Sequence, residues 1–294
     1  MDAVDSAALK KLALEAGAAA CAVASAAPPA VLARFRAALA AQEGPVPAWL
    51  AREPERRADI KRWDPAARSV LVCLFPYWNS SLEKEFENLQ PADPAAFLRG
   101  TGRRRINSPL LERLRAAGVK PKISRYALPR DYHAAIREVL EGVLARAAGT
   151  FPGLEGKVFC DTSPVMEKPL AAAAGLGWQG RNTLLLNSRL GSWSFVGGLT
   201  LNLEFPADIP PEYTGCGSCR ECEKACPAGA LAGGRLDLSR CLSWHNTMET
   251  AGGPFPGEAS GWGYGCDECQ KKCPFNEGAS GTVPSFLGPL RSWE

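Results

Sequence analysis

The sequence has no long hydrophobic run, no strong charge excess and no internal repeat outside its cysteines. A membrane-spanning helix needs about 20 apolar residues, so we expect no membrane span. With 34 basic and 31 acidic residues the formal net charge is only +3, and global charge identifies no partner. The Ala-rich segment 12–27 follows Asp2 and Asp5 and contains Glu15, which disfavours a secretory signal peptide. We therefore expect a cytoplasmic protein.

Cysteine, by contrast, is plentiful. The 294 residues include 11 cysteines, and eight of them form two sets with metal-ligand spacing. The first set is a Cys-x2-Cys-x2-Cys-x3-Cys-Pro run that begins at Cys216, and the second ends in Cys266-x2-Cys269-x3-Cys273-Pro274, with Cys241 between them. Thiolates in such patterns fit a reducing compartment better than a disulfide scaffold.

The first run has the bacterial ferredoxin spacing, in which three cysteines bind one [4Fe–4S] cluster and the fourth binds the other. The second set has only two cysteines before its last one, and Cys241 supplies the missing ligand. The predicted ligands of one cluster are Cys216, Cys219, Cys222 and Cys273, and those of the other are Cys226, Cys241, Cys266 and Cys269. Two zinc knuckles are the alternative, since Cys-x2-Cys pairs also suit zinc. The paired Cys-x3-Cys-Pro endings favour iron–sulfur clusters.

Hydrophobic periodicity predicts alternating helices and strands over the first two thirds of the chain. Helices are predicted at 6–16, near 31–39 and at 135–148, and strands at 18–24, 69–75, 157–160 and 193–203. This alternation predicts a mixed α/β (α+β) fold with helices packed on a sheet. From Ile209 onward Pro, Gly and Cys dominate, as in a small module held by its metal ligands. We therefore expect an α/β core at 1–208 and a double-cluster module at 209–294.

A basic segment interrupts this pattern. Ten Lys or Arg residues lie between Arg99 and Arg130, with Glu112 as the only acidic residue before Asp131. We interpret 79–122 as an insertion that is either a solvated surface or, more specifically, a phosphate-contacting patch centred on Arg103, Arg104 and Arg105.

Polar residues gather at two other places. His133 lies at the start of the 135–148 helix, where a helix-start or surface histidine is more common than a ligand. Asp161 follows the 157–160 strand, and an aspartate there is usually a helix cap. Pro164 suits the first helical position, which would make Ser163 the cap and leave Asp161 free at the strand end, where ligands often bind. The glycines of 175–180 match a dinucleotide fingerprint only weakly, because no clear strand precedes them.

Seven segments resemble the epoxyqueuosine reductase family, in the same order and with similar spacing. They are RYALPRDYH, FCDTSPVMEK, AGLGWQGRNTLLLN, GSWSFVGG, CGSCRECEKACPAGAL, RCLSW and YGCDECQKKCP, and the resemblance covers about residues 50–78 and 123–277. It implies a nitroreductase-like core that holds cobalamin base-off, followed by a ferredoxin-like module with two [4Fe–4S] clusters. It also implies reduction of epoxyqueuosine to queuosine in a tRNA anticodon loop, with electrons from an external low-potential donor. We expect the protein to be a monomer.

The resemblance also implies roles for single residues. Asp161 is the candidate acid that protonates the oxygen released when the epoxide opens, and we expect burial beside the corrin to raise its pKa. The positions expected to contact cobalamin are Arg57, Tyr126, Asp161, Asn182, Leu185, Val196, Ser243, Trp244 and Asp267.

The sequence departs from the family in three places. The segment from Leu82 to Lys122 is longer than the usual connection, the residues after Cys241 differ from the family's, and nothing after Pro274 resembles the C-terminal helical repeats that longer members use on tRNA. We therefore expect a short form of the family. Two alternatives remain: a reductive dehalogenase-like enzyme acting on a small molecule, and an electron-transfer protein that reduces cobalamin on a partner.

Overall fold

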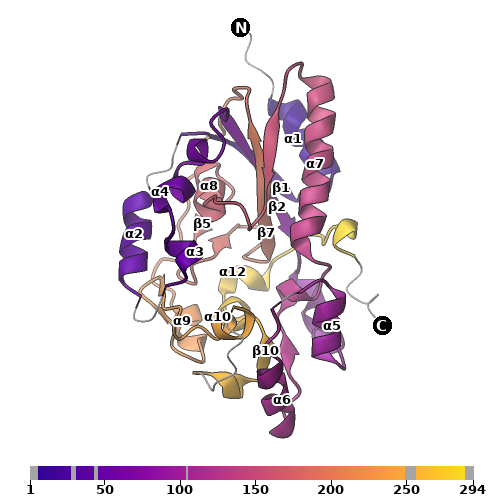
Figure 1. Ribbon diagram of the computed structural model, residues 1–294, viewed down its shortest axis with the longest axis vertical. Helices are drawn as coiled ribbons and strands as arrows, with labels where there is room; N and C mark the ends of the chain where they lie inside the picture. Colours follow the sequence, from indigo (N-terminus) through magenta and orange to yellow (C-terminus); the bar gives the residue numbers. More distant parts are fainter. Residues whose placement is uncertain (1–5, 28–30, 43–45, 104, 249–255, 289–294) are drawn as a thin grey trace.

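The central feature of the computed structural model, which describes residues 6–27, 31–42, 46–103, 105–248 and 256–288, is a four-stranded sheet (Figure 1). Its strands, in spatial order, are β1 (Ala20–Ser25), β2 (Ser69–Pro76), β7 (Ser194–Leu201) and β4 (Gly156–Phe159). All three pairings are antiparallel, and the longest joins β2 to β7 from Ser69↔Leu201 to Pro76↔Ser194. The predicted mixed α/β fold is confirmed, and its sheet is antiparallel.

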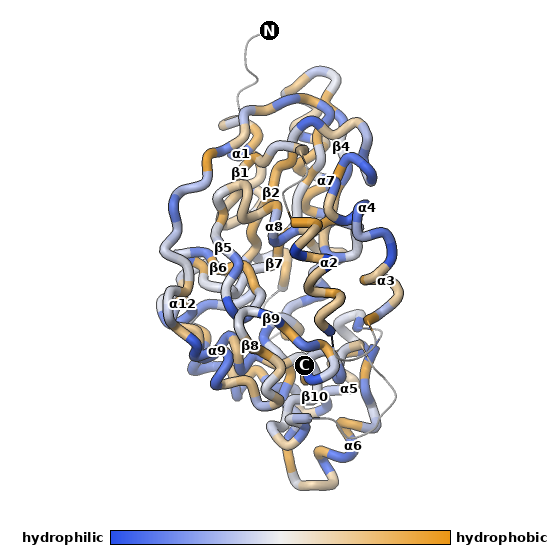
Figure 2. Tube along the Cα trace, turned by 90° about the vertical axis from the view of Figure 1, so that its left-hand side faces the viewer, coloured by the Kyte–Doolittle hydropathy of each residue, from blue (hydrophilic) through white to orange (hydrophobic). Residues whose placement is uncertain are grey.

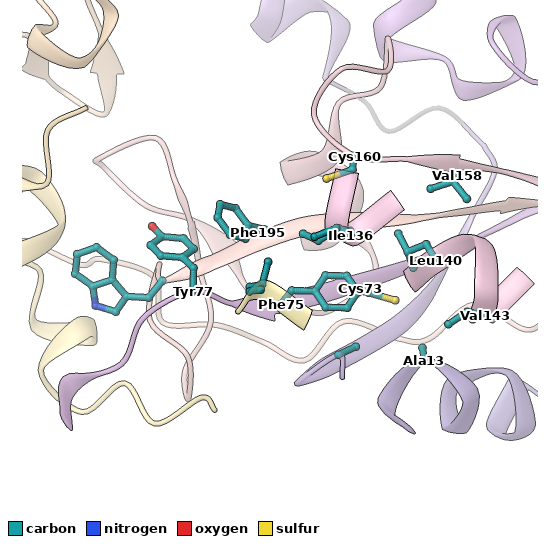
Figure 3. Packing of buried hydrophobic residues seen from close by; sticks show 14 of the residues in the cluster. Ala13, Cys73, Phe75, Tyr77, Ile136, Leu140, Val143, Val158, Cys160 and Phe195 are labelled. Atoms are coloured by element: carbon teal, nitrogen blue, oxygen red, sulfur yellow. The ribbon is translucent and has the colours of Figure 1, made fainter. Parts of the chain in front are cut away.

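The alternation of side chains along β2 builds two apolar layers, because successive residues of a strand face opposite sides of the sheet. Leu71, Cys73 and Phe75 pack with α1 (Ser6–Glu15) and α7 (Tyr132–Thr150) on one side. Figure 3 shows this layer, with Ile136, Leu140 and Val143 of α7 near Cys73 and Phe75. The intervening residues Val70, Val72 and Leu74 pack with α8 (Glu167–Ala173) on the other side.

Two glycines in β7 allow α7 and the neighbouring strands to approach closely. A Cβ on Gly197 would lie 2.9 Å from Cγ2 of Ile136, and one on Gly198 would lie 2.2 Å from the carbonyl oxygen of Leu71. Glycine in a strand often marks such a close approach. The first turn of α7 is capped by Asp131, whose side chain accepts the His133 N–H at 3.2 Å. This cap holds the main chain of His133 in the first turn of the helix.

The remaining elements are short. The other helices are α2 (Leu32–Ala40), α3 (Ala48–Ala51), α4 (Pro54–Ala58), α5 (Pro94–Gly100), α6 (Ser108–Ala116), α9 (Glu221–Ala225), α10 (Leu242–Thr247), α11 (Glu268–Lys271) and α12 (Pro274–Glu277). The other strands are β3 (Lys122–Ile123), β5 (Trp178–Gln179), β6 (Leu185–Leu186), β8 (Leu231–Ala232), β9 (Arg235–Leu236) and β10 (Trp262–Tyr264).

The cysteine-rich part of the chain is interlocked with the sheet-containing part. β10 pairs in parallel with β3, so one strand from each side of the predicted boundary builds a common two-stranded sheet. Near the end of the described chain, the Phe286 ring packs edge-on against Phe75 of β2, with ring centroids 5.7 Å apart. The boundary at residue 208 stays a prediction, and these contacts join the two parts at two separate places.

Hydropathy follows this arrangement. Figure 2 shows hydrophobic residues along central strands such as β2 and hydrophilic residues on outer segments such as α4 and α9. Among the described residues, no helix is both long and apolar enough to cross a membrane.

Candidate functional site

A cavity of about 390 Å³ is lined by residues from both parts of the chain. The sheet-containing part contributes Tyr126, Asp161 and Phe195, and the cysteine-rich part contributes Cys241 and Gln270. A group bound in this cavity therefore contacts both parts at once.

The eight predicted ligand cysteines surround two different cavities. Cys226, Cys241, Cys266 and Cys269 line the large cavity. Cys216, Cys219, Cys222 and Cys273 line a second, smaller cavity that shares Asn182 with the first. This grouping is the same as the predicted division into two clusters, while the ligand role of each thiol stays a prediction.

Short helices position several of these thiols. Cys222 lies within α9 and Cys269 within α11, while Cys241 and Cys273 are the N-cap residues of α10 and α12. Pro274 begins α12, because its ring fixes φ near the helical value and its missing N–H is not needed in a first turn. The Cys-Pro pair therefore starts a helix directly after the thiol.

Each set of four thiols lines one cavity, as the ligands of one four-iron cluster would. The four thiolates of a [4Fe–4S] cluster bind four separate irons, whereas tetrahedral zinc draws four ligands onto one centre. Burial raises the pKa of Cys266 and Cys269, so these thiols must release protons when iron binds.

Asp161 lies on the wall of the large cavity, directly after β4. Its φ of 57° is in the left-handed region, which non-glycine residues seldom adopt. Two tight turns follow, in which the Thr162 N–H donates to the Cys160 carbonyl at 2.6 Å and the Val165 N–H donates to the Ser163 carbonyl at 2.8 Å. Because these turns occupy the chain, α8 starts only at Glu167, and the predicted helix start at Ser163–Pro164 is wrong.

His133 bridges two carboxylates. Its Nε2 lies 2.8 Å from Oδ2 of Asp161, and its Nδ1 lies 2.7 Å from Oδ1 of Asp131. The Tyr132 hydroxyl also donates to Asp161, at 3.0 Å. The Tyr132 ring is stacked between the rings of His133 and Phe195, with a centroid separation of 4.0 Å on each side. His133 lies in the first turn of α7, at the helix start that its sequence context favours, and the stack and the two carboxylates fix its imidazole.

The two partners of the Asp161–His133 pair have opposite pKa shifts. Burial lowers the pKa of His133, but hydrogen bonds and charges from Asp131 and Asp161 outweigh it and raise the value to about 9. Burial raises the pKa of Asp161, but the hydrogen bond and charge of His133 outweigh this and leave it below its ordinary value. The expectation that Asp161 has a raised pKa is therefore wrong. At neutral pH the pair holds its proton on His133.

Six of the nine positions predicted to contact cobalamin line the large cavity. They are Tyr126, Asp161, Asn182, Leu185, Val196 and Ser243. Within the described structure, two polar atoms of this wall, Nδ2 of Asn182 and Oγ of Ser194, are buried without a hydrogen-bond partner. Buried polar groups are nearly always paired, so these two atoms indicate a ligand with polar substituents. Cobalamin, an apolar corrin surface fringed by amides, fits this wall.

The other three positions lie outside the cavity lining. Arg57 lies in α4 and Trp244 in α10. Asp267 is fully buried, and its carboxylate accepts hydrogen bonds from Ser124 Oγ and, at 2.9 Å each, from the Arg125 main-chain N–H and guanidinium. Internal hydrogen bonds therefore occupy the carboxylate of Asp267 in this structure, and its contact with cobalamin stays a prediction.

The partner of Asp267 is a buried arginine to which the sequence assigned no role. The Arg125 guanidinium is fully buried, lies 2.6 Å from a Glu83 carboxylate oxygen and stacks on Phe86 with 3.8 Å to the ring centroid. Since Asp267 lies between Cys266 and Cys269, the Arg125–Asp267 ion pair anchors one cluster loop to the sheet-containing part. Nothing in the sequence indicates this pair, because its members are 142 residues apart.

Most of the basic segment is occupied by internal contacts. Arg103, the predicted centre of a phosphate patch, is only 7% exposed and pairs with Asp131 at 3.4 Å, so it is not a surface residue. Arg104 lies outside the described residues. Ion pairs also hold Arg113, Arg115, Arg125 and Arg130, and Lys122 lies over the Trp262 ring. Of the described basic residues of the segment, only Arg99, Arg105 and Lys120 are exposed without a carboxylate partner.

Two further cavity residues, Glu167 and Lys168, had no predicted role. Glu167 accepts a hydrogen bond from the main-chain N–H of Asp161. Burial and the charge of Asp161 raise the pKa of Glu167 to about 8. Lys168 donates to the Thr183 carbonyl at 3.0 Å, and burial lowers its pKa. Both belong to the segment FCDTSPVMEK, but their proximity to Asp161 depends on the delayed start of α8.

Two family models match the chain. "Epoxyqueuosine reductase QueG, DUF1730" matches residues 57–162, and "4Fe-4S double cluster binding domain" matches residues 215–276. Epoxyqueuosine reductase of Cyclobacterium marinum is 39% identical over 232 residues, which are 78% of this chain and 65% of the relative. The Aliivibrio fischeri enzyme is 42% identical over 161 residues, which are 53% of this chain and 43% of the relative. The chain thus spans about half to two thirds of the length of these relatives.

Solved structures share the fold. An epoxyqueuosine reductase structure with an epoxyqueuosine-modified tRNA-Tyr stem loop has a TM-score of 0.71 at 23% identity, covering 96% of this chain and 68% of that one. A Bacillus subtilis epoxyqueuosine reductase, whose catalytic aspartate loop is swung out of the active site, has a TM-score of 0.70 at 22% identity with the same coverage. A reductive dehalogenase matches with a TM-score of 0.52 at 18% identity, covering 97% of this chain and 34% of that one.

Sequence and structure point to the same family. The family models match on both sides of the large cavity, and the cavity holds the cysteines and Asp161 of the segments that resemble the family. Together with the identities to the curated relatives, this shows that the chain belongs to the epoxyqueuosine reductase family.

Proposed function

We propose that the chain reduces epoxyqueuosine to queuosine within a tRNA anticodon loop, using two [4Fe–4S] clusters and cobalamin. The observation that carries this proposal is the large cavity, which is lined both by one cysteine set and by Asp161, whose carboxylate in turn pairs with His133. Opening an epoxide releases an oxyanion, so the reaction needs a proton as well as electrons. A cavity lined by both kinds of residue is suited to supply both to one substrate.

Cobalamin and the clusters, when bound, supply the low-potential electrons and the reactive cobalt. The protein's task is to hold and orient these groups. Leu185 and Val196 provide an apolar wall, while Asn182 and Ser194 offer unpaired polar atoms to the amide substituents. Ser243 approaches from the cysteine-rich part. We propose that the sheet-containing part corresponds to the nitroreductase-like, base-off cobalamin domain of the family.

Asp161 and His133 deliver the proton in this proposal. The proton rests on the His133 imidazolium and reaches the substrate oxygen through Asp161, which lies 2.8 Å from Nε2 and is 56% exposed. Asp131 holds the other imidazole nitrogen at 2.7 Å and stabilises its positive charge. An oxyanion is a strong base, so it draws the proton from the pair even though Asp161 itself is ionised at neutral pH.

We further propose that the described position of the Asp161 loop is its inward one. In the Bacillus subtilis relative the catalytic aspartate loop is swung out of the active site. Here Asp161 reaches the cavity, and its contacts with Tyr132 and His133 hold it there.

A tRNA substrate and an external low-potential electron donor are the proposed partners. The tRNA stem loop bound to a relative supports the first of these. We propose that the protein is a monomer and that it acts in the cytoplasm, where tRNA and reduced electron carriers are available. Among the described cations of the basic segment, Arg99, Arg105 and Lys120 are the exposed ones that remain for phosphate contact.

The direct test is nucleoside analysis. The chain is reconstituted anaerobically with iron, sulfide and cobalamin, reduced, and incubated with tRNA from a strain that lacks the enzyme. We expect epoxyqueuosine to disappear and queuosine to appear in equal amount. Turnover of small organohalides without conversion of tRNA would favour the dehalogenase-like alternative. Cobalamin reduction that leads to turnover only with a second protein would favour the electron-transfer alternative.

A further inference from the structure

We propose that Glu167 is a positioning residue that latches the Asp161 loop in the cavity by accepting the main-chain N–H of Asp161. The inference rests on the proposed role of Asp161 in proton delivery. Glu167 acts through Asp161 and does not itself contact the reacting atoms.

Asp161 needs an external support because its backbone is in a disfavoured conformation. Its φ of 57° lies in the left-handed region, where the side chain of a non-glycine residue crowds its own backbone. Such conformations persist only where surrounding contacts impose them. The contacts here act at both ends of the residue. His133 and Tyr132 hold the carboxylate, and Glu167 holds the main-chain amide.

The rest of the loop does little to fix the main-chain amide of Asp161. Asp161 and Thr162 are exposed. The two nearby backbone hydrogen bonds, Thr162 to Cys160 and Val165 to Ser163, are local turns that move with the loop. In the described structure, the acceptor for the Asp161 N–H is the Glu167 carboxyl group. Removal of that acceptor would leave the strained residue tied only through its side chain.

Glu167 is mounted on a rigid element. It is the first residue of α8, and Leu170 and Ala171 of that helix are buried in the apolar layer beneath the sheet. A side chain fixed to a packed helix can impose a position on a loop, whereas a side chain on the loop itself cannot.

The carboxyl group of Glu167 works here as a hydrogen-bond acceptor rather than as a charge. Burial and the nearby Asp161 carboxylate raise the pKa of Glu167 to about 8, so at neutral pH the group is largely protonated. Its carbonyl oxygen still accepts the amide N–H, and a neutral Glu167 avoids repulsion with Asp161. A glutamine side chain offers the same acceptor at the same reach, which makes Glu167→Gln the conservative replacement.

The test compares Glu167→Ala with Glu167→Gln in the cluster-loaded protein. Hydrogen-exchange mass spectrometry on peptides covering 160–166 measures the loop without substrate, and nucleoside analysis measures turnover. We expect Glu167→Ala to exchange at least about tenfold faster in these peptides and to lose at least about tenfold in turnover. Glu167→Gln should stay within about threefold of the unaltered protein in both. Glu141→Ala, which removes an exposed glutamate of α7, is the matched control and should change neither.

Two results would overturn the latch. One is unchanged exchange and turnover in Glu167→Ala. The other is a Glu167→Gln protein as slow in turnover as Glu167→Ala but with normal exchange, since this would make Glu167 a proton donor instead. If Glu167→Ala does not fold, Glu167→Asp, which is one methylene too short to reach the amide, takes its place with the same expectations. A different outcome is that the unaltered protein converts no tRNA while Glu167→Ala still exchanges faster than it does. That combination would contradict the proposed function and leave the latch intact.

Discussion

Two networks of carboxylates and cations lie near the large cavity, and they differ in exposure and in backbone conformation. In the first, Asp161 is 56% exposed and pairs with a histidine that is itself 33% exposed. In the second, Asp267 and Arg125 are both fully buried. Asp161 has a left-handed backbone, whereas Asp267 is the N-cap residue of α11 with an ordinary negative φ of −106°.

The difference is the one expected between the chemical role proposed for Asp161 and an architectural role for Asp267. Asp267 directs its carboxylate to Ser124 and Arg125, and its burial keeps it away from any substrate. Asp161 is held by fewer groups and presents its carboxylate to the cavity. Strained, partly exposed residues with shifted pKa values are typical of functional sites, while saturated buried pairs are typical of structural anchors. Ion pairing alone therefore does not identify a catalytic carboxylate.

The largest effect is expected at the cluster that the buried pair supports. Cys241→Ala should lower the iron content after anaerobic reconstitution from about eight to about four per chain, because one cluster loses a ligand. Chemical iron analysis and electron paramagnetic resonance of the remaining cluster check this. Cys21→Ala, at a half-buried cysteine outside both sets, should keep the full iron content. A Cys241→Ala protein with undiminished iron would refute the predicted ligand set.

Arg125→Met should cause the next largest effect, on stability. It leaves the Asp267 carboxylate buried without its cation, and breaking a buried ion pair costs about 3–5 kcal/mol. Thermal unfolding of the cluster-loaded protein should show a marked drop in Tm, and the cluster that includes Cys266 and Cys269 should become labile.

Arg115→Met is the matched control for that variant. It breaks an exposed pair with Asp93, whose members are 45% and 56% exposed, and exposed pairs contribute under about 1 kcal/mol. Equal Tm values for Arg125→Met and Arg115→Met would contradict the anchoring role of the buried pair.

The exposed network should show itself in the pH dependence of turnover. The pKa of His133 is raised to about 9, so its charged form, and the ion pairs that depend on it, persist at neutral pH and disappear as pH rises through about 9. Single-turnover rates should therefore fall by about tenfold per pH unit above that value. In His133→Gln this limb should disappear, at a lower overall rate. An unchanged alkaline limb in His133→Gln would assign it to another group, with Glu167 the nearest candidate.

The smallest effect is expected from the basic segment. Since ion pairs and ring contacts occupy most of its cations, replacing Arg99, Arg105 and Lys120 by alanine removes at most three cations that can reach a phosphate. The slope of log affinity for tRNA against log salt should become shallower by roughly 0.7 to 0.9 for each phosphate that is no longer neutralised. Alanine at Lys11, Lys61 and Arg68, which are also exposed, is the control. Identical slopes for both triple variants would assign the segment to solvated surface.

The sequence predicted local features well and distant contacts poorly. The strand at β2 follows from a continuous apolar run and the helix at α7 from apolar residues at helical spacing, and both are present. The cysteine spacing predicted two groups of four, and the structure places the same two groups around two cavities. The Arg125–Asp267 pair could not be predicted, because it joins residues 142 positions apart. Its two members follow β3 and β10, the strands that join the two parts of the chain.

The Asp161 site shows the same limit at short range. The place of Asp161 after a strand was predictable, but the predicted helix start was three residues too early. Helix-capping preferences do not reveal the left-handed conformation at Asp161 or the two turns that follow it. The direction of its pKa shift was wrong for a related reason. Burial was anticipated, but the neighbouring imidazolium of His133, which outweighs burial, comes from another element.

The most direct measurement pairs Asp161→Asn with Asp267→Asn and records both turnover and Tm in cluster- and cobalamin-loaded protein. Asparagine is nearly isosteric with aspartate and cannot relay the proton. Asp161→Asn should keep its Tm within about 2 °C and lose roughly 10²-fold in single-turnover conversion of epoxyqueuosine, the range expected when a general acid is removed. Asp267→Asn should lose stability and retain turnover once loaded. Near-normal turnover in a folded, fully loaded Asp161→Asn protein would contradict the proposed role of Asp161 in proton delivery.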